Sequence, residues 1–228
     1  MRGISGSSVR LWLTATAGIA VGLAGIRVIG WHGPILKMPG VSRKMQLSLD
    51  AEAAAHTLGC EHEPDVLIFD HLTIPDAWPS QYMPHLHFSS LTFRGSVIPL
   101  EALSYLSPSV RYVTLDRSNV VDEHLSRCPS GLLGLSLRDT KITDKGIFGM
   151  SQVVQLEELS LAGTKITDRV VSRLRGCIKL RKLDLSSTDI SNACLEDLAS
   201  ITTLDAVNVS KTRVTRDAVR ESPLSRSQ

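Results

Sequence analysis

Aromatic residues are scarce in this 228-residue chain. They make up 4% of the sequence, although 43% of the residues are hydrophobic. A buried core must therefore be built mainly from the aliphatic side chains of Leu, Val and Ile. The chain is long enough for one domain of ordinary size together with a leader.

Acidic residues are absent from positions 1–49, which carry six basic residues; Asp50 is the first carboxylate. The rest of the chain holds 19 basic and 23 acidic residues, a mildly acidic balance. It has no concentrated basic stripe of the kind that phosphate backbones require. We therefore do not expect a nucleic-acid partner.

Paired cysteines and catalytic signatures are also missing. Cys60, Cys128, Cys177 and Cys194 form no CxxC pair, and their wide spacing predicts buried free thiols. No GxSxG, GxGxxG, P-loop or HExxH motif occurs. We expect neither catalysis nor a cofactor.

Histidines provide two weak candidates for metal ligation. His56, Cys60 and His62 lie within seven residues, but their spacing matches no closed zinc pattern. A helix end followed by a polar turn explains them better. His85 and His87 could share one face of an extended segment, but they have no third ligand. We therefore expect no metal.

One long uncharged stretch, Leu11 to Ile26, continues after Arg27 to Trp31. Residues 11–31 are long enough to span a bilayer, and Arg and Trp suit its interface. We therefore expect residues 1–31 to be a signal anchor. The alternatives are a cleaved signal peptide, a mitochondrial presequence, and a soluble domain whose first helix is merely apolar.

The orientation of this leader is not fixed by its charges, because basic residues lie on both sides of it. N-terminal signals usually place the following domain outside the cytoplasm, so we expect a membrane-associated, extracytoplasmic domain. Secretion after cleavage and, for a eukaryotic source, a mitochondrial location are the alternatives.

A linker and a cap are predicted next. Residues 32–47 contain Gly, Pro and basic residues and are typical of a linker. The Ala-rich stretch from Ser48 to Thr57 predicts a helix, and we interpret residues 48–65 as a capping helix and turn. Such a cap would cover the open end of the domain that follows.

Residues 66–219 contain an internal repeat. Its pattern is LxxLxL, two further residues, a hydroxyl residue, one residue and an aliphatic residue. The last apolar position of LxxLxL recurs every 22–24 residues, at Phe69, Phe93, Leu115, Leu137, Leu161, Leu185 and Val209. This period predicts an α/β leucine-rich-repeat solenoid of about seven units, with parallel strands on the concave face and helices on the convex face.

The chemistry of the repeat explains its pattern. LxL alternation places two aliphatic side chains on one face of a strand, where each contributes about 1.5–3 kcal/mol once neighbouring units cover it. We expect the hydroxyl residues to tie each turn to the next. They are Ser96, Ser118, Thr140, Thr164, Thr188 and Thr212. Thr143-Asp144 and Thr167-Asp168 are predicted helix caps.

The phrases LRDTKITDKG, LAGTKITDRV and LSSTDISNAC resemble the TxITD-type leucine-rich repeats of many bacterial proteins, notably those of planctomycetes. The resemblance covers residues 66–219 and extends to the leader only in general layout. It implies a membrane segment before a short repeat domain, a role as a protein-interaction scaffold, and no shared catalytic residues.

Repeat geometry sends the side chains between the core positions to the concave face. With strands about 4.8 Å apart, we expect Arg94, Asp116 and Arg138 to form an alternating charge ladder and Glu158 to face Lys182. We predict a protein-binding surface centred on Arg94, Tyr112 and Arg138. The candidate residues are Arg94, Tyr112, Asp116, Arg138, Glu158, Lys182, Asp184 and Asn208. The alternative is a solvated face with weak lateral ion pairs.

Three functions are compatible with these features. The first is a membrane-anchored protein-interaction module, and the second is a structural subunit or assembly factor of a membrane complex. Exposed apolar residues on the convex helices would favour the second. An enzyme, the third, would require a pocket with convergent titratable groups. The polar tail, residues 220–228, is short for a cap, so Val209 and Val214 are expected to be partly open to a partner or another copy.

Overall fold

The computed structural model describes residues 20–22, 25–27, 55, 61–63 and 65–222. The strands are β1 (Ala20–Gly22), β2 (Gly25–Arg27), β3 (Glu61–Glu63), β4 (Val66–Asp70), β5 (Ser90–Arg94), β6 (Tyr112–Thr114), β7 (Gly134–Ser136), β8 (Glu158–Ser160), β9 (Lys182–Asp184) and β10 (Ala206–Asn208). The α-helices are α3 (Trp78–Tyr82), α4 (Asp122–Leu125), α5 (Asp144–Gly149), α6 (Asp168–Leu174), α7 (Leu195–Ser200) and α8 (Arg216–Glu221). The short 3-10 segments are η1 (Met83–His85), η2 (Ala102–Tyr105), η3 (Ser151–Gln155) and η4 (Asn192–Cys194).

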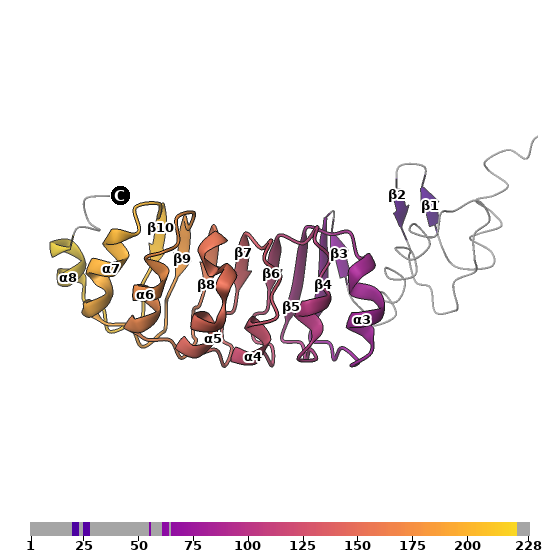
Figure 1. Cartoon of the computed structure of the whole chain (residues 1–228), viewed down its shortest axis with the longest axis horizontal. Coiled ribbons are helices and arrows are strands. Elements are labelled where there is room, and N and C mark those ends of the chain that lie inside the picture. The colour runs from indigo at the N-terminus through magenta and orange to yellow at the C-terminus, as the bar shows by residue number, and fades with distance from the viewer. Residues whose placement is uncertain (1–19, 23–24, 28–54, 56–60, 64, 223–228) are drawn as a thin grey trace, which may run out of the picture.

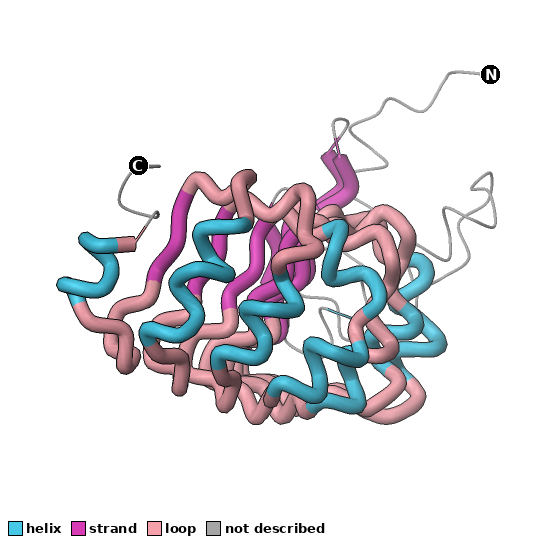
Figure 2. The backbone as a smooth tube through the Cα atoms, turned by 60° about the vertical axis from the view of Figure 1, so that its left-hand side comes forward, coloured by secondary structure: helices cyan, strands magenta, loops and turns pink. Residues whose placement is uncertain are grey.

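One sheet organises the domain. Strands β4 to β10 lie in sequence order and pair in parallel, and β3 pairs antiparallel with β4 at one end. The helical return segments form a second layer on one side of the sheet, in front of the strands in Figures 1 and 2, and consecutive units stack side by side. This arrangement confirms the predicted solenoid of parallel strands alternating with helices.

The predicted register is also confirmed. Leu67 aligns with Leu91, Leu91 with Val113, and the same position continues along the sheet to Val207. Leu137, Leu161 and Leu185 are fully buried in a common interior. At the N-terminal end this interior includes two phenylalanines, Phe69 and Phe93, whose rings stack with their centroids 4.7 Å apart.

The hydroxyl residues after the strands mostly serve a different role from the predicted one. In five turns the hydroxyl donates to a carbonyl three residues earlier in its own turn; Thr140 and Leu137 O, 2.6 Å apart, are one example. Ser96 alone among the six shows the expected link: it donates to Phe69 O at 2.8 Å and accepts from Leu72 N–H at 3.0 Å. A hydroxyl has a single proton to donate, and in these five turns the carbonyl of the same turn accepts it.

Links between units are made instead where the return helices begin. Asp144, the first residue of α5, accepts from the N–H and the hydroxyl of Thr167 in the next unit. Asp122 does the same with Thr143, and Asp168 with Ser191. Thr143 and Thr167 also cap their own helices, as predicted. In these three units one carboxylate thus links each helix to the start of the next.

Each of the strands β4 to β10 is followed by a residue in the left-handed backbone region, which allows the sharp bend of the turn. These residues, with φ between 54° and 69°, are His71, Gly95, Arg117, Asp139, Gly163, Ser187 and Lys211. Only two of the seven are glycine. The remaining five have a Cβ in a conformation that L-residues disfavour.

Most of the N-terminal predictions lie outside the described residues. Within the predicted leader, β1 and β2 form a short antiparallel pair. In the predicted cap, Ala55 is helical and fully buried against the core, and β3 lies where only a turn was expected. The linker 32–47 and residues 223–228 are not described. No helix in the described part of the chain has both the length and the apolar character needed to cross a bilayer.

Candidate protein-binding face

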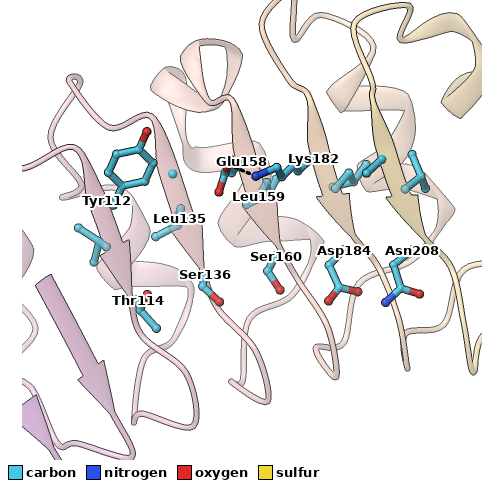
Figure 3. Close-up of a pocket in the computed structure, with 15 residues that line it drawn as sticks. Tyr112, Thr114, Leu135, Ser136, Glu158, Leu159, Ser160, Lys182, Asp184 and Asn208 are labelled. Atoms are coloured by element: carbon cyan, nitrogen blue, oxygen red, sulfur yellow. Dashed lines mark hydrogen bonds and ion pairs between the residues drawn. The ribbon is translucent and has the colours of Figure 1, made fainter. Parts of the chain in front are cut away.

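The side chains of β4–β10 that point away from the core form a surface that we call the strand face, and it corresponds to the predicted concave face. A shallow groove of about 350 Å³ lies on it across β6 to β10 (Figure 3). Five of the eight predicted site residues line this groove: Tyr112, Glu158, Lys182, Asp184 and Asn208. Arg94, Asp116 and Arg138 lie outside its lining.

Tyr112 and the Glu158–Lys182 pair belong to one row of the strand face. Sheet register places Tyr112 beside Gly134, Gly134 beside Glu158, and Glu158 beside Lys182. The aromatic ring of Tyr112 lies against Gly134, where a Cβ atom would come within 2.5 Å of the ring. Gly134 therefore creates the space for the ring, and Tyr112 remains 39% exposed.

The predicted contact between Glu158 and Lys182 is confirmed. The ammonium of Lys182 donates to a carboxylate oxygen of Glu158 at 2.6 Å. This hydrogen bond, together with the charge of Glu158, raises the pKa of Lys182. Both side chains are about half exposed or more, so solvent screens the pair and it adds little to stability. Both charges can therefore reorganise around a partner.

The predicted ladder of Arg94, Asp116 and Arg138 does not form. Asp116 instead accepts hydrogen bonds from the hydroxyl of Ser136 at 2.5 Å and from the backbone N–H of Arg138 at 3.1 Å. The guanidinium of Arg138 reaches two units along the sheet to Asp184, at 3.5 Å. The expectation was wrong because the Asp116 carboxylate finds donors in the adjacent turn, which leaves Arg138 to pair further away.

Two features lie in the unit between those of Arg138 and Asp184. Ala162 is only 4% exposed, although its position faces away from the core. The hydroxyl of Ser160 is buried without a hydrogen-bond partner among the described residues. Sequence reasoning missed both features, because the repeat pattern assigns these positions to an exposed face.

The other two predicted residues lie at the margins of the face. Arg94 ends β5 beside Asp70, and its side chain is exposed. Asn208 lies on the last strand, where its side-chain oxygen accepts from Ser210 N–H at 3.1 Å. The structure thus separates Arg94 from the groove and keeps Asn208 within it.

No group of three His, Cys, Asp or Glu side chains in the described region is arranged to hold a metal ion. His56 and Cys60 lie outside that region. Cys128, Cys177 and Cys194 are free and buried, as predicted. Burial raises the pKa of both Cys128 and Cys194 to about 12, so these thiols stay protonated at neutral pH.

Comparisons with known proteins agree with this geometry. A family model described as Leucine Rich repeat matches residues 176–199. The solved structure of internalin C2 from Listeria monocytogenes covers 79% of this chain, with 18% identity and a TM-score of 0.51, and 80% of its own length is matched. The fold is that of a leucine-rich-repeat protein. No curated protein matches the sequence.

Two further leucine-rich-repeat structures are similar at lower scores. An internalin (inlF) from the same bacterium shows 20% identity and a TM-score of 0.45 over 64% of this chain. The Arabidopsis receptor kinase HAESA, solved with the peptide hormone IDA and the co-receptor SERK1, shows 18% identity and a TM-score of 0.43 over 57%. This chain spans 48% of the first structure and 23% of the second. Leucine-rich-repeat domains are generally non-catalytic binding modules.

Proposed function

We propose that this leucine-rich-repeat protein is a membrane-anchored protein-interaction module that binds its partner on the strand face. The observation that supports the proposal is the groove across β6 to β10, which gathers Tyr112, Glu158, Lys182, Asp184 and Asn208 on consecutive strands. Strands stacked on a common core hold such side chains rigidly, so binding costs little ordering of the backbone.

The chemistry of the groove favours a polar, specific partner. Tyr112 is the aromatic residue of the lining, and aromatic and Arg side chains are the usual anchors of strong interfaces. Arg94 and Arg138 lie at the margin and can add charged contacts. Charged groups on the partner would compete for the members of the Glu158–Lys182 and Arg138–Asp184 pairs. Recognition therefore depends on how the partner's charges are arranged.

The binding test compares the full chain with a triple variant, Arg94→Ala, Tyr112→Ala and Arg138→Ala. Proximity labelling with the native leader intact identifies neighbours, and purified candidates are then titrated against both chains. We expect the variant to lose at least about tenfold in affinity, as truncation of interface anchors does. Unchanged affinity would reject the proposed site.

A matched control carries Tyr105→Ala, Lys145→Ala and Lys179→Ala. Tyr105 is 37% exposed, close to the 39% of Tyr112, but lies on η2 in the return layer. Lys145 and Lys179 are exposed and also lie outside the strand face. This control should retain the affinity of the parent chain, and a loss equal to that of the first variant would also reject the site.

Membrane attachment through residues 11–31, with the domain outside the cytoplasm, is part of the proposal. Its support is the apolar stretch of the sequence and the flanking Arg27 and Trp31. Alkaline extraction of membranes and mass spectrometry of the mature N-terminus test it. Release into the soluble fraction with an intact N-terminus would reject anchoring, and cleavage after the apolar stretch would favour secretion or import.

A second function, as a structural subunit or assembly factor of a membrane complex, is favoured by apolar residues exposed on the return layer. Phe148 on α5 is 43% exposed, with the guanidinium of Arg169 5.8 Å from its ring centroid, and Ile178 is 72% exposed. Phe148→Ser combined with Ile178→Ser tests this alternative. Loss of co-purifying subunits with this variant, but not with the strand-face variant, would support it.

A further inference from the structure

Charge is distributed unevenly over the helical return segments. Residues 66–219 as a whole hold equal numbers of basic and acidic residues, 17 of each. The two consecutive segments that contain α5 and α6, residues 141–155 and 165–179, hold seven basic and two acidic residues. The next segment, residues 189–203, holds three acidic residues and no basic one. Positive charge is therefore concentrated on two neighbouring units of the return layer.

The two acidic residues of these segments, Asp144 and Asp168, are already engaged. Each accepts two hydrogen bonds from the capping residue of the following unit, one at each carboxylate oxygen. Four of the basic residues are exposed and form no ion pair with any described residue. They are Lys141, Lys145, Lys165 and Arg169. Their charges are therefore available to an anionic surface.

An exposed aromatic ring lies among these cations. Phe148 on α5 is 43% exposed, and the guanidinium of Arg169 on α6 lies 5.8 Å from its ring centroid. Lys145 lies three residues before Phe148 on the same helix and so shares its side of α5. Lys141 and Lys165 each lie three residues before a helix, at equivalent positions of the two units. We call these five residues the basic patch.

We propose that the basic patch docks on an anionic lipid bilayer, with its cations at the headgroups and Phe148 in the interface. The inference rests on the proposed membrane anchoring. Lys and Arg beside an exposed aromatic ring are typical of protein surfaces that lie on membranes. Three of the four cations are lysines, which are depleted in protein–protein interfaces, so the patch suits lipid headgroups better than an acidic protein.

The anchor and the basic patch act together. A leader in the bilayer holds the domain at a high effective concentration beside it, so a patch of modest affinity is enough for docking. Helices α5 and α6 lie on the opposite side of the sheet from the strand face (Figures 1 and 2). Docking through the return layer therefore leaves the strand-face groove accessible to a partner, and Phe148 contacts lipid rather than another subunit.

A polarity-sensitive fluorophore on Gly149→Cys reports docking. The substitution fits, because a Cβ atom there meets nothing within 4 Å. Cys60→Ser accompanies it, since the other three cysteines are buried. The full chain is reconstituted into vesicles of phosphatidylcholine, alone or mixed with phosphatidylglycerol. We expect a blue shift only with phosphatidylglycerol, and its loss at high salt, which screens exposed charges. The same label on Ala206→Cys, on the strand face, should not shift.

Neutralisation of the four cations tests the role of charge. Each charge removed should lower the ratio of docked to undocked domain about fivefold. The variant therefore should not dock. It carries Lys141→Gln, Lys145→Gln, Lys165→Gln and Arg169→Gln. The matched control loses the same net charge from exposed residues outside the basic patch and should dock like the parent. It carries Arg111→Gln, Arg117→Gln, Arg181→Gln and Lys211→Gln.

Replacement of the aromatic ring tests its insertion into the interface. Phe148→Ser should lower the ratio of docked to undocked domain about tenfold, because the ring no longer buries apolar surface in the lipid. Tyr105→Ser is the control, since this ring is 37% exposed on η2, in a different unit of the return layer. It should leave docking unchanged, and an equal loss in both variants would contradict the role of Phe148.

Flotation separates docking from anchoring. The leader should carry the full chain with phosphatidylcholine vesicles whether or not the basic patch docks. Flotation without a label shift in phosphatidylglycerol vesicles overturns the inference and leaves anchoring intact. A chain that does not float with phosphatidylcholine rejects anchoring, and the label in phosphatidylglycerol vesicles then decides docking alone. An equal label shift with polyglutamate in place of vesicles, or equal losses in the two charge variants, would also overturn the inference.

Discussion

The Asp144 carboxylate on α5 accepts two hydrogen bonds from Thr167 of the next unit, one from its N–H at 2.8 Å and one from its hydroxyl at 2.7 Å. A backbone donor and a side-chain donor are thus satisfied together at a partly buried position between units. The same geometry recurs at Asp122 and Asp168. In the last pair of units, Asn192 takes the position of the aspartate and accepts from Thr215 N–H at 2.8 Å.

Replacement of Asp144 should therefore depend on the residue that replaces it. Asp144→Ala leaves the Thr167 N–H without its acceptor and should lower the free energy of unfolding by about 1–3 kcal/mol. Asp144→Asn should cost less, because Asn192 already serves in this position. Urea denaturation followed by circular dichroism measures both. Asp189→Ala, which removes an exposed carboxylate 4.0 Å from Arg213, is the control, and an equal loss there would contradict the argument.

His124 should make stability depend on pH. It is 4% exposed on α4, and burial is the main cause that lowers its pKa. The unfolded chain, with a histidine pKa of about 6.5, then binds protons more readily than the folded chain. Stability should be complete above pH 6.5 and fall as the pH drops through that value towards the lowered folded pKa. Melting temperatures at pH 7.5 and 5.5 measure the effect.

His124→Gln should reduce this pH dependence, because glutamine carries no titrating group and can still accept from Val121 N–H, as the histidine does at 3.3 Å. His71→Gln is the control, since the His71 side chain is 73% exposed. A pH dependence that disappears with His71→Gln and persists with His124→Gln would show that the buried imidazole is not its source.

At the left-handed turn positions, replacing serine with glycine and replacing glycine with serine should have opposite effects on stability. Ser187 has φ of 57°, so Ser187→Gly should stabilise the domain by about 0.5–1 kcal/mol, because relief of the Cβ strain exceeds the added backbone entropy. Gly163→Ser should destabilise it, since a Cβ there would lie 2.2 Å from an Asp139 carboxylate oxygen. Chemical denaturation of both variants checks the signs. A loss of stability in Ser187→Gly would contradict this account of the turn.

The buried thiols should resist alkylation while the domain is folded. Cys128 and Cys194, each with a pKa of about 12 caused chiefly by burial, supply little thiolate at pH 8. Iodoacetamide labelling followed by peptide mass spectrometry should find both unmodified in native protein and modified in urea. Labelling of Cys128 at the same rate in both conditions would be evidence against its burial.

What could be predicted from the sequence depended on whether the repeat pattern left a residue one possible set of neighbours or several. The positions of the strands and the buried column through Leu137 and Leu161 were predictable, because each repeat must place its apolar residues in the same way to be covered by the next. The Glu158–Lys182 contact was predictable for the same reason, since register alone makes the two residues neighbours.

Side chains that had more than one reachable partner were not predictable. Asp116 bonds to Ser136 and the Arg138 backbone, Arg138 extends to Asp184, and Thr140 closes its own turn. The amino-acid sequence determined the repeat, its period and its core, because these follow from apolar periodicity. The tertiary structure decided which polar groups pair, because several partners lie at similar distances and the choice depends on the exact positions of atoms in neighbouring units.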